Sequence, residues 1–151
     1  MADTDRIERS IVLRAPRARV WRAISDPREF GTWFGVALEG DFVSGATVRG
    51  RITHPGYEHV TMEMSIERVE PETLLSYRWH PHAVRADVDY SAEPTTLVEL
   101  RLEEVAGGTR LTVVESDFDR IPASRRDEAF RRNGDGWSQQ IRNVEAHVAA
   151  A

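Results

Sequence analysis

The C-terminal part of the chain carries the clearest helical pattern. From Pro122 to about Val148, apolar or small residues recur at alternating steps of four and three. This spacing predicts an amphipathic helix with one buried stripe, and Pro122 suits its first turn, where a missing N–H costs nothing. The predicted stripe consists of Phe130, Gly134, Trp137, Ile141, Val144 and Val148, and the predicted solvent face includes Arg125, Arg126, Asp127, Arg131, Arg132, Arg142 and Glu145.

Two glycines interrupt this helical stretch, in Asn133-Gly134-Asp135-Gly136. Each costs about 1 kcal/mol relative to alanine in a helix interior. They indicate one of two things. The helix kinks or breaks here, or the missing side chain at Gly134 lets a ligand or a sheet backbone approach closely.

Most of the chain before this helix alternates between apolar and polar residues, which predicts β-strands. A first strand runs from Arg6 to Leu13, and further strands are predicted at 36–43, 47–53, 60–67, 75–79, 98–103 and around 111–113. Short connections between them predict an antiparallel meander with one buried face. Two short helices follow the first strand: one opens at Pro16, and the other covers Arg28 to Trp33 and ends at Gly35.

The segment 81–95 is the exception, because it is a longer and more polar connection. Long loops often form the mouth or the lid of a binding site. Repeats and linker-like composition are absent from the sequence, and 151 residues suit one domain with a full hydrophobic core. We therefore expect a single domain over 1–151.

The composition removes several classes of function. The chain has no cysteine and no lysine, which excludes disulfides, thiol nucleophiles, Schiff-base catalysis and a P-loop. A net charge of −5 with interspersed signs argues against nucleic acid as the main partner. The polar start and the lack of a long apolar run give no sign of a signal peptide or of membrane insertion, so we expect a cytoplasmic protein.

Several short motifs together resemble a known family. They are Ala15-Pro16, Val20-Trp21, Trp33-Phe34-Gly35, Tyr77-Arg78-Trp79-His80-Pro81, Gly108-Thr109-Arg110-Leu111-Thr112-Val113 and Gly136-Trp137-Ser138-Gln139-Gln140-Ile141. Their order resembles the START-like superfamily, also called SRPBCC or birch-pollen-allergen-like. Within it, the chain resembles the branch named after activator of heat-shock protein 90 ATPase homologue 1.

The resemblance implies an α+β helix-grip fold. In this fold a curved antiparallel sheet wraps around a long C-terminal helix, two short helices follow the first strand, and a cavity lies between sheet and helix. Members bind or process small, largely apolar molecules. The chain departs from the branch at Asp117, where glycine is more usual. The co-chaperones of the branch carry a further N-terminal domain for which there is no room before Arg6, so chaperone contact is a weak expectation.

Strand parity selects the candidate ligand-binding residues. Inward-facing apolar and aromatic side chains suit either an adaptable pocket or an ordinary core, and both interpretations stay open for each residue. The candidates are Trp33, Phe42, His54, Met62, Met64, Tyr77, Trp79, Glu115, Phe130, Gly134, Trp137 and Ile141.

Two of these candidates are polar residues on apolar faces. His54 shares parity with Ile52, and Glu115 shares parity with Val113. If the strands stay regular, both side chains point inward near strand ends, where burial would raise the pKa of a carboxylate and favour a binding or acid–base role. If the strands have already ended, both lie at the solvated rim. Pro55-Gly56 favours the rim for His54.

Other polar residues give weaker signals. His80-Pro81-His82 has no evident third ligand, so we expect no metal site and no cofactor. His59 and His147 are expected to be exposed, and the arginines are expected to serve surface solubility.

Three functions are compatible with these patterns. The first is binding of a small apolar or amphipathic molecule by a monomer or homodimer. The second is a cyclase or dehydratase acting on a polyketide-like substrate, with Glu115 or His54 moving protons. The third is a co-chaperone-like interaction module, which requires a large exposed apolar patch.

Overall fold

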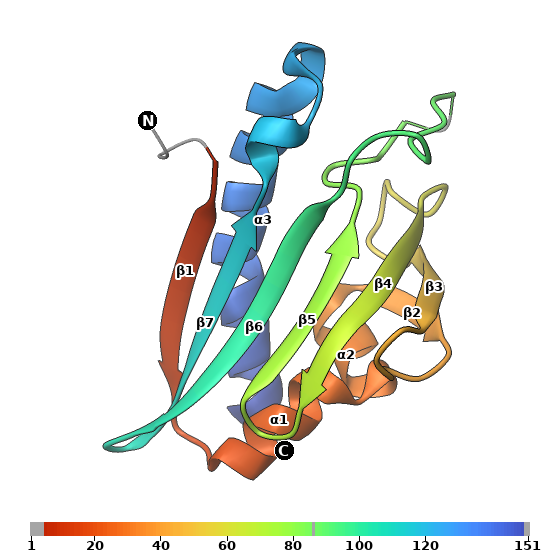
Figure 1. The fold of residues 1–151 in the computed structure, drawn as a ribbon. Coiled ribbons are helices and arrows are strands. Elements are labelled where there is room, and N and C mark those ends of the chain that lie inside the picture. Colours follow the sequence, from red (N-terminus) through yellow and green to blue (C-terminus); the bar gives the residue numbers. More distant parts are fainter. Residues whose placement is uncertain (1–4, 86, 150–151) are drawn as a thin grey trace.

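A computed structural model describes residues 5–85 and 87–149 and shows a seven-stranded antiparallel sheet packed against one long helix (Figure 1). The elements are β1 (Ile7–Leu13), α1 (Arg17–Ser25), α2 (Pro27–Phe34), β2 (Val36–Glu39), β3 (Thr47–Ile52), β4 (Thr61–Glu70), β5 (Leu74–Trp79), β6 (Thr96–Val105), β7 (Gly108–Ser116), a short 3-10 helix (Phe118–Arg120) and α3 (Ala123–Ala149). The predicted helix-grip fold is confirmed.

The sheet has the order β1-β7-β6-β5-β4-β3-β2. All neighbours except β1 and β7 are consecutive in the chain, and β1 joins the sheet by pairing with β7, with Ile7 opposite Glu115. Because side chains alternate along a strand, the register gathers Trp79, Thr96 and Glu115 on the face that α3 covers.

Helix α3 is continuous from Ala123 to Ala149, so the break that its glycines could have indicated is absent. Pro122 precedes the helix, and its carbonyl accepts from the N–H groups of Arg125 and Arg126. Burial of Gly134, Trp137 and Val144 follows the predicted stripe.

Strand lengths differ from the sequence pattern at β2, which was predicted to reach residue 43. It ends at Glu39, because Gly40 takes a left-handed φ of 108° and turns the chain. Phe42 is then 7% exposed and packs edge-on against Phe30 from a loop, not from a strand.

Asp117 also has left-handed backbone, with φ 76° and ψ 22°. Glycine adopts this conformation without strain, which accounts for the glycine that is usual in the branch. Aspartate tolerates it better than most residues, and Arg78 Nη2 lies 3.2 Å from its carboxylate. Asp117 thus adopts the left-handed turn after β7 with its carboxylate paired to Arg78.

The three helices meet around Glu29 of α2. Its carboxylate accepts from Arg19 at 2.8 Å and Arg22 at 2.7 Å, both on α1, and it lies 2.8 Å from His147 Nε2 on α3. His147, expected to be exposed, is therefore largely covered, with 19% of its side chain accessible. Burial alone would raise the pKa of Glu29, but these hydrogen bonds lower it to about 2.

We expect Glu29→Gln to lower the free energy of unfolding by about 2 kcal/mol near neutral pH. A lowered folded-state pKa means that the contribution is present above the ordinary value of 4.5 and is lost as the pH falls towards about 2. Urea unfolding of both proteins at pH values spanning this window measures the difference. If the difference in unfolding free energy between wild type and variant were as large at the lowest pH as near neutral pH, the lowered pKa of Glu29 would not be its cause.

Within the part of the chain that the structure describes, no helix is both long and apolar enough to cross a membrane.

Candidate functional site

A cavity of about 560 Å³ opens at one end of the sheet. It lies between the β3–β4 connection, the β5–β6 loop and the middle of α3, on the side of Figure 1 where both loops extend beyond the strands. Its apolar lining consists of Phe34, Ile52, Val60, Met62, Trp79, Ala83, Val84, Val88 and Gly136, and its polar lining of His54, Tyr57, His59, Thr61, Glu63, His80, His82, Arg85, Tyr90, Gln139, Gln140 and Asn143.

Three of the twelve candidate residues line this cavity, namely His54, Met62 and Trp79. His54 is exposed at the rim, since β3 has already ended at Ile52. The others lie outside the lining: Trp33, Phe42, Met64, Tyr77, Glu115, Gly134 and Trp137 are buried, and Phe130 and Ile141 are partly buried.

The middle of the space between sheet and helix is filled. The void beside Trp33, Trp137 and Ile141 has no room for a water molecule. Gly134 leaves no ligand space either, because a Cβ there would lie 3.1 Å from Arg9 Nη2 of β1. Gly136 has no neighbour within 4 Å of such a Cβ and lines the cavity. The open space is therefore beside the second glycine of the pair, not the first.

Sequence reasoning missed most of the lining, which comes from the β3–β4 connection and the β5–β6 loop. The length and polarity of segment 81–95 were the available signal, and Ala83, Val84, Arg85, Val88 and Tyr90 of that loop do line the cavity. Phe34 was quoted only as part of a motif. Its ring lies 5.9 Å from that of Trp79 and 6.1 Å from that of Trp137.

Glu115 lies behind the cavity wall and is fully buried. Its oxygens accept from Trp79 Nε1 at 2.7 Å, Thr96 Oγ1 at 2.6 Å, Trp137 Nε1 at 2.8 Å, and Asn133 Nδ2 at 3.0 and 3.1 Å. Burial raises the pKa of Glu115, and the four donors oppose this. The carboxylate thus joins β5, β6, β7 and α3, and it sets the position of the Trp79 ring that lines the cavity.

Tyr77 lies beside this cluster with its side chain fully buried. Among the described residues, none offers its hydroxyl a hydrogen bond. Burial, and then the nearby Glu115, raise the pKa of Tyr77. The neutral phenol packs against the Trp79 ring, with the ring centroids 5.4 Å apart. Tyr77 is therefore a core residue.

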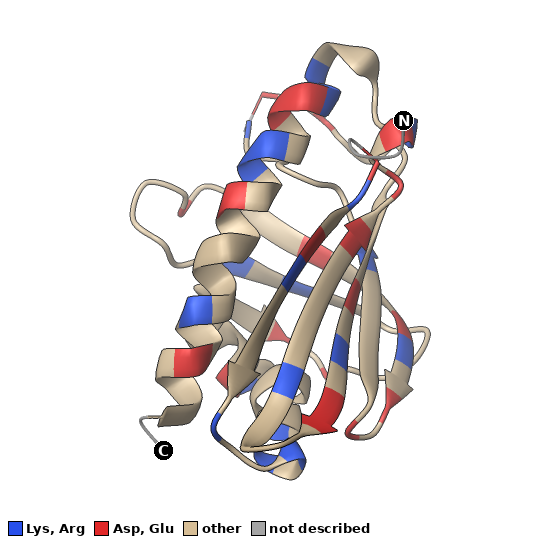
Figure 2. Ribbon diagram, turned by 90° about the vertical axis from the view of Figure 1, so that its left-hand side faces the viewer, with Lys and Arg blue, Asp and Glu red and all other residues tan. Residues whose placement is uncertain are grey.

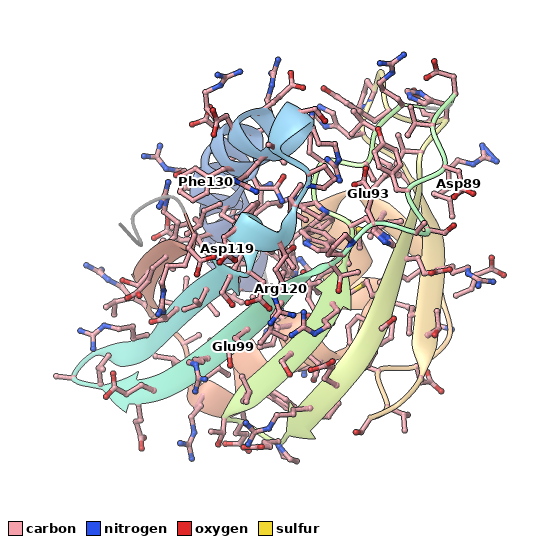
Figure 3. The ribbon with its side chains drawn as sticks, turned by 45° about the horizontal axis from the view of Figure 1, so that its top comes forward. Asp89, Glu93, Glu99, Asp119, Arg120 and Phe130 are labelled. Atoms are coloured by element: carbon pink, nitrogen blue, oxygen red, sulfur yellow. The ribbon has the colours of Figure 1, made fainter. Side chains whose placement is uncertain are left out.

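Arg125 fastens the β5–β6 loop to the start of α3. Its Nε donates to Glu93 Oε1 at 2.8 Å, its Nη1 donates to the Pro81 carbonyl at 2.8 Å, and its guanidinium lies 4.8 Å from the Tyr90 ring centre. Figure 3 shows Glu93 on the part of the loop nearer to α3 and Asp89 farther out. Arg125 was expected on the solvent face, but only 17% of its side chain is exposed. The role of the arginines is therefore not limited to surface solubility.

Arg125→Ala should loosen this loop. It removes an ion pair, a carbonyl contact and a cation–π contact at once. We expect limited proteolysis within 81–95 to become several-fold faster while the melting temperature falls by only a few degrees, because the loop lies outside the core. The exposed Arg142→Ala is the matched control on the same helix. Equal cleavage rates in both variants would show that Arg125 does not hold the loop.

Metal ligation is not evident in the described ranges, which hold no group of three or more candidate metal ligands. His80 Nε2 instead lies 3.0 Å from the Glu93 carbonyl. Acidic and basic residues alternate along α3 (Figure 2).

Both the sequence and the fold resemble those of known proteins. A family model described as Activator of Hsp90 ATPase homolog 1-like protein matches residues 14–149. Curated proteins gave no significant sequence match. DynU16, a protein in the dynemicin biosynthetic locus, is 25% identical with a TM-score of 0.74, and the match covers 96% of this chain and 47% of DynU16. This chain thus spans about half the length of DynU16.

Two further solved structures match over nearly their whole length. NE0264 from Nitrosomonas europaea is 19% identical, with a TM-score of 0.77 and coverage of 99% of this chain and 97% of that one. The Aha1 dimer from Colwellia psychrerythraea is 13% identical, with a TM-score of 0.71 and coverage of 95% of both chains. These likenesses show the fold, and the family model covers most of the sequence. The chain belongs to the Activator of Hsp90 ATPase homolog 1-like protein family.

Proposed function

We propose that this protein binds a small, largely apolar molecule in the cavity between the β3–β4 connection, the β5–β6 loop and α3. The cavity itself carries the proposal. A volume of about 560 Å³ lies within the range of small-molecule sites. Its wall combines Phe34, Met62 and Trp79 with polar groups from both loops and from α3, which suits a ligand with an apolar body and some polar atoms.

A saturable titration tests this proposal. N-phenyl-1-naphthylamine is a neutral dye that fluoresces in apolar surroundings, and Trp79 in the wall should transfer excitation to it. We expect one-to-one binding, and a rise in melting temperature that grows with dye concentration, because a ligand at about a hundred times its dissociation constant adds roughly 2.7 kcal/mol. Linear, non-saturating fluorescence with no thermal shift would refute the proposal.

A second candidate is an enzyme of the cyclase or dehydratase kind acting on a polyketide-like substrate. His54 at the cavity rim and the likeness to DynU16 favour it. Glu115 does not, because its oxygens already accept from four side chains behind the wall. Turnover of a bound substrate that survives His54→Gln would remove His54 from the mechanism.

The setting of the protein is part of the proposal. A cysteine-free chain is compatible with the reducing cytoplasm, and a monomer or homodimer suits a cavity built within one chain. A co-chaperone-like role would require a large exposed apolar patch, and the large hydrophobic side chains that the described residues expose, Val12, Val43, Tyr57 and Val88, come from four different segments.

A further inference from the structure

Four of the five histidines line the cavity: His54, His59, His80 and His82. The fifth, His147, bonds to Glu29 outside the lining. A neutral imidazole always carries one ring nitrogen that accepts a hydrogen bond and one that donates. Four neutral rings therefore bring four acceptor nitrogens to the lining, beside four donors. Burial is the main reason why the pKa of His82 is lowered, and the lowered pKa favours the neutral ring of this residue.

The tautomers of two of these rings follow from their contacts. His59 Nε2 lies 2.9 Å from the Val84 carbonyl, and His80 Nε2 lies 3.0 Å from the Glu93 carbonyl. A carbonyl oxygen can only accept, so each Nε2 carries the proton. The ring atom left to a ligand is then Nδ1, a lone-pair acceptor in the neutral imidazole.

The charged side chains of the lining already have partners of opposite sign. The two charged residues of the lining are paired, Arg85 with Asp87 and Glu63 with Arg49.

The amides on α3 bond to one another or to the backbone. Gln139 donates to Asn143, Asn143 donates to Gln140, and Gln140 donates to the Phe34 carbonyl. Each of these amide nitrogens thus uses one of its two N–H groups within the protein. Among the described residues of this wall, a ligand meets no arginine without an acidic partner.

We propose that the ligand is a neutral molecule whose hydroxyl group donates to Nδ1 of His59 or His80, with its apolar body against Met62 and Trp79. This proposal rests on the proposed function and narrows it. It distinguishes the ligand from a fatty or aromatic carboxylate, which would bring a negative charge to a lining whose arginine, Arg85, is already paired with Asp87.

Three probes of one shape separate these cases by calorimetric titration near pH 7.5. 2-Naphthol is neutral there and carries a donor, 2-naphthoate is an anion, and 2-methylnaphthalene has no polar group. We expect 2-naphthol to bind roughly three- to tenfold more tightly than 2-methylnaphthalene, the range of one net hydrogen bond. The anion should bind more weakly than either.

His59→Phe and His80→Phe, singly and together, remove the acceptors but keep a ring. In the double variant the ratio of 2-naphthol to 2-methylnaphthalene affinity should fall to about one, because only the hydrogen bond is lost. Loosening of the loop would change both affinities alike and leave the ratio intact. His147→Phe removes the histidine outside the lining and should keep the wild-type ratio.

Each outcome decides a separate point. If 2-methylnaphthalene binds and 2-naphthol gains nothing, or if the double variant keeps the wild-type ratio, the imidazole proposal fails while apolar binding stands. Preferential binding of 2-naphthoate also overturns it, in favour of an anionic ligand. If none of the three probes binds, the proposed function itself fails.

Discussion

Glu115→Ala is expected to cost about 3–5 kcal/mol of unfolding free energy, the largest effect of any single change considered for this protein. The substitution leaves four donors, on Trp79, Thr96, Asn133 and Trp137, without their acceptor. These donors come from β5, β6 and α3, so the change also removes the hydrogen bonds by which Glu115 of β7 links the sheet to the terminal helix. The Trp79 ring then loses its hydrogen bond beside the cavity.

Urea unfolding measures this loss, with two controls. Glu115→Gln keeps the volume and one acceptor oxygen, and should cost less than the alanine variant. Glu103→Ala removes an exposed carboxylate on β6 whose partner is Arg110, and should cost less than about 1 kcal/mol. A Glu115→Ala protein within 1 kcal/mol of wild type would show that the four hydrogen bonds contribute little.

The pH dependence of Glu115 has the opposite sign to that of Glu29. Because burial raises the pKa of Glu115, the folded protein holds this proton more tightly than the unfolded chain. Its contribution is therefore greatest in acid and declines as the pH rises from the ordinary carboxylate range through the raised pKa. Over that window wild type should lose stability relative to Glu115→Gln, which has no titrating group.

Gly136→Leu is expected to reduce affinity for N-phenyl-1-naphthylamine at least tenfold while raising stability by up to about 1 kcal/mol. The backbone at Gly136 is helical, and a Cβ there meets nothing within 4 Å. Leucine therefore gains helix propensity over glycine, and its side chain takes space within the cavity that Gly136 lines. A loss of binding caused by partial unfolding would come with a loss of stability. The expected gain in stability therefore distinguishes a blocked cavity from an unfolded protein.

Gly136→Ala is the matched control, since it gains the same propensity but adds only a methyl group. It should be as stable as Gly136→Leu and bind the dye nearly as well as wild type. Gly134→Ala makes the contrast within the same helix, because its Cβ approaches Arg9 at 3.1 Å and should bring no loss of binding. Unchanged dye affinity in Gly136→Leu would mean that the dye binds elsewhere.

The patterns that predicted the fold are local ones. The stripe containing Trp137 and Val144 repeats at helical spacing, and Met62, Met64 and Ile66 alternate at strand spacing. Each pattern depends on neighbouring residues in one element, and the structure confirms the element in each case. The predicted length of β2 was wrong for a local reason as well. The left-handed turn at Gly40 ends a strand that the alternation of apolar and polar residues would have continued.

The sequence by itself determined the element order, the buried face of each element and the position of the long loop before β6. It also placed Glu115 on an apolar face but left open whether the side chain was inside. Tertiary structure decided that question, because the register puts four donors from three elements around the carboxylate. Their hydrogen bonds offset the free-energy cost of burying it.

Tertiary structure likewise decided where the open space lies. Side chains that face inward with the same parity either fill a gap or border one, and the outcome depends on distances between elements that parity does not encode. Arg9 fills the space at Gly134, whereas the β3–β4 connection and the β5–β6 loop leave space beside Gly136. Loop positions follow from contacts between distant residues, such as Arg125 with Glu93, which no local period records.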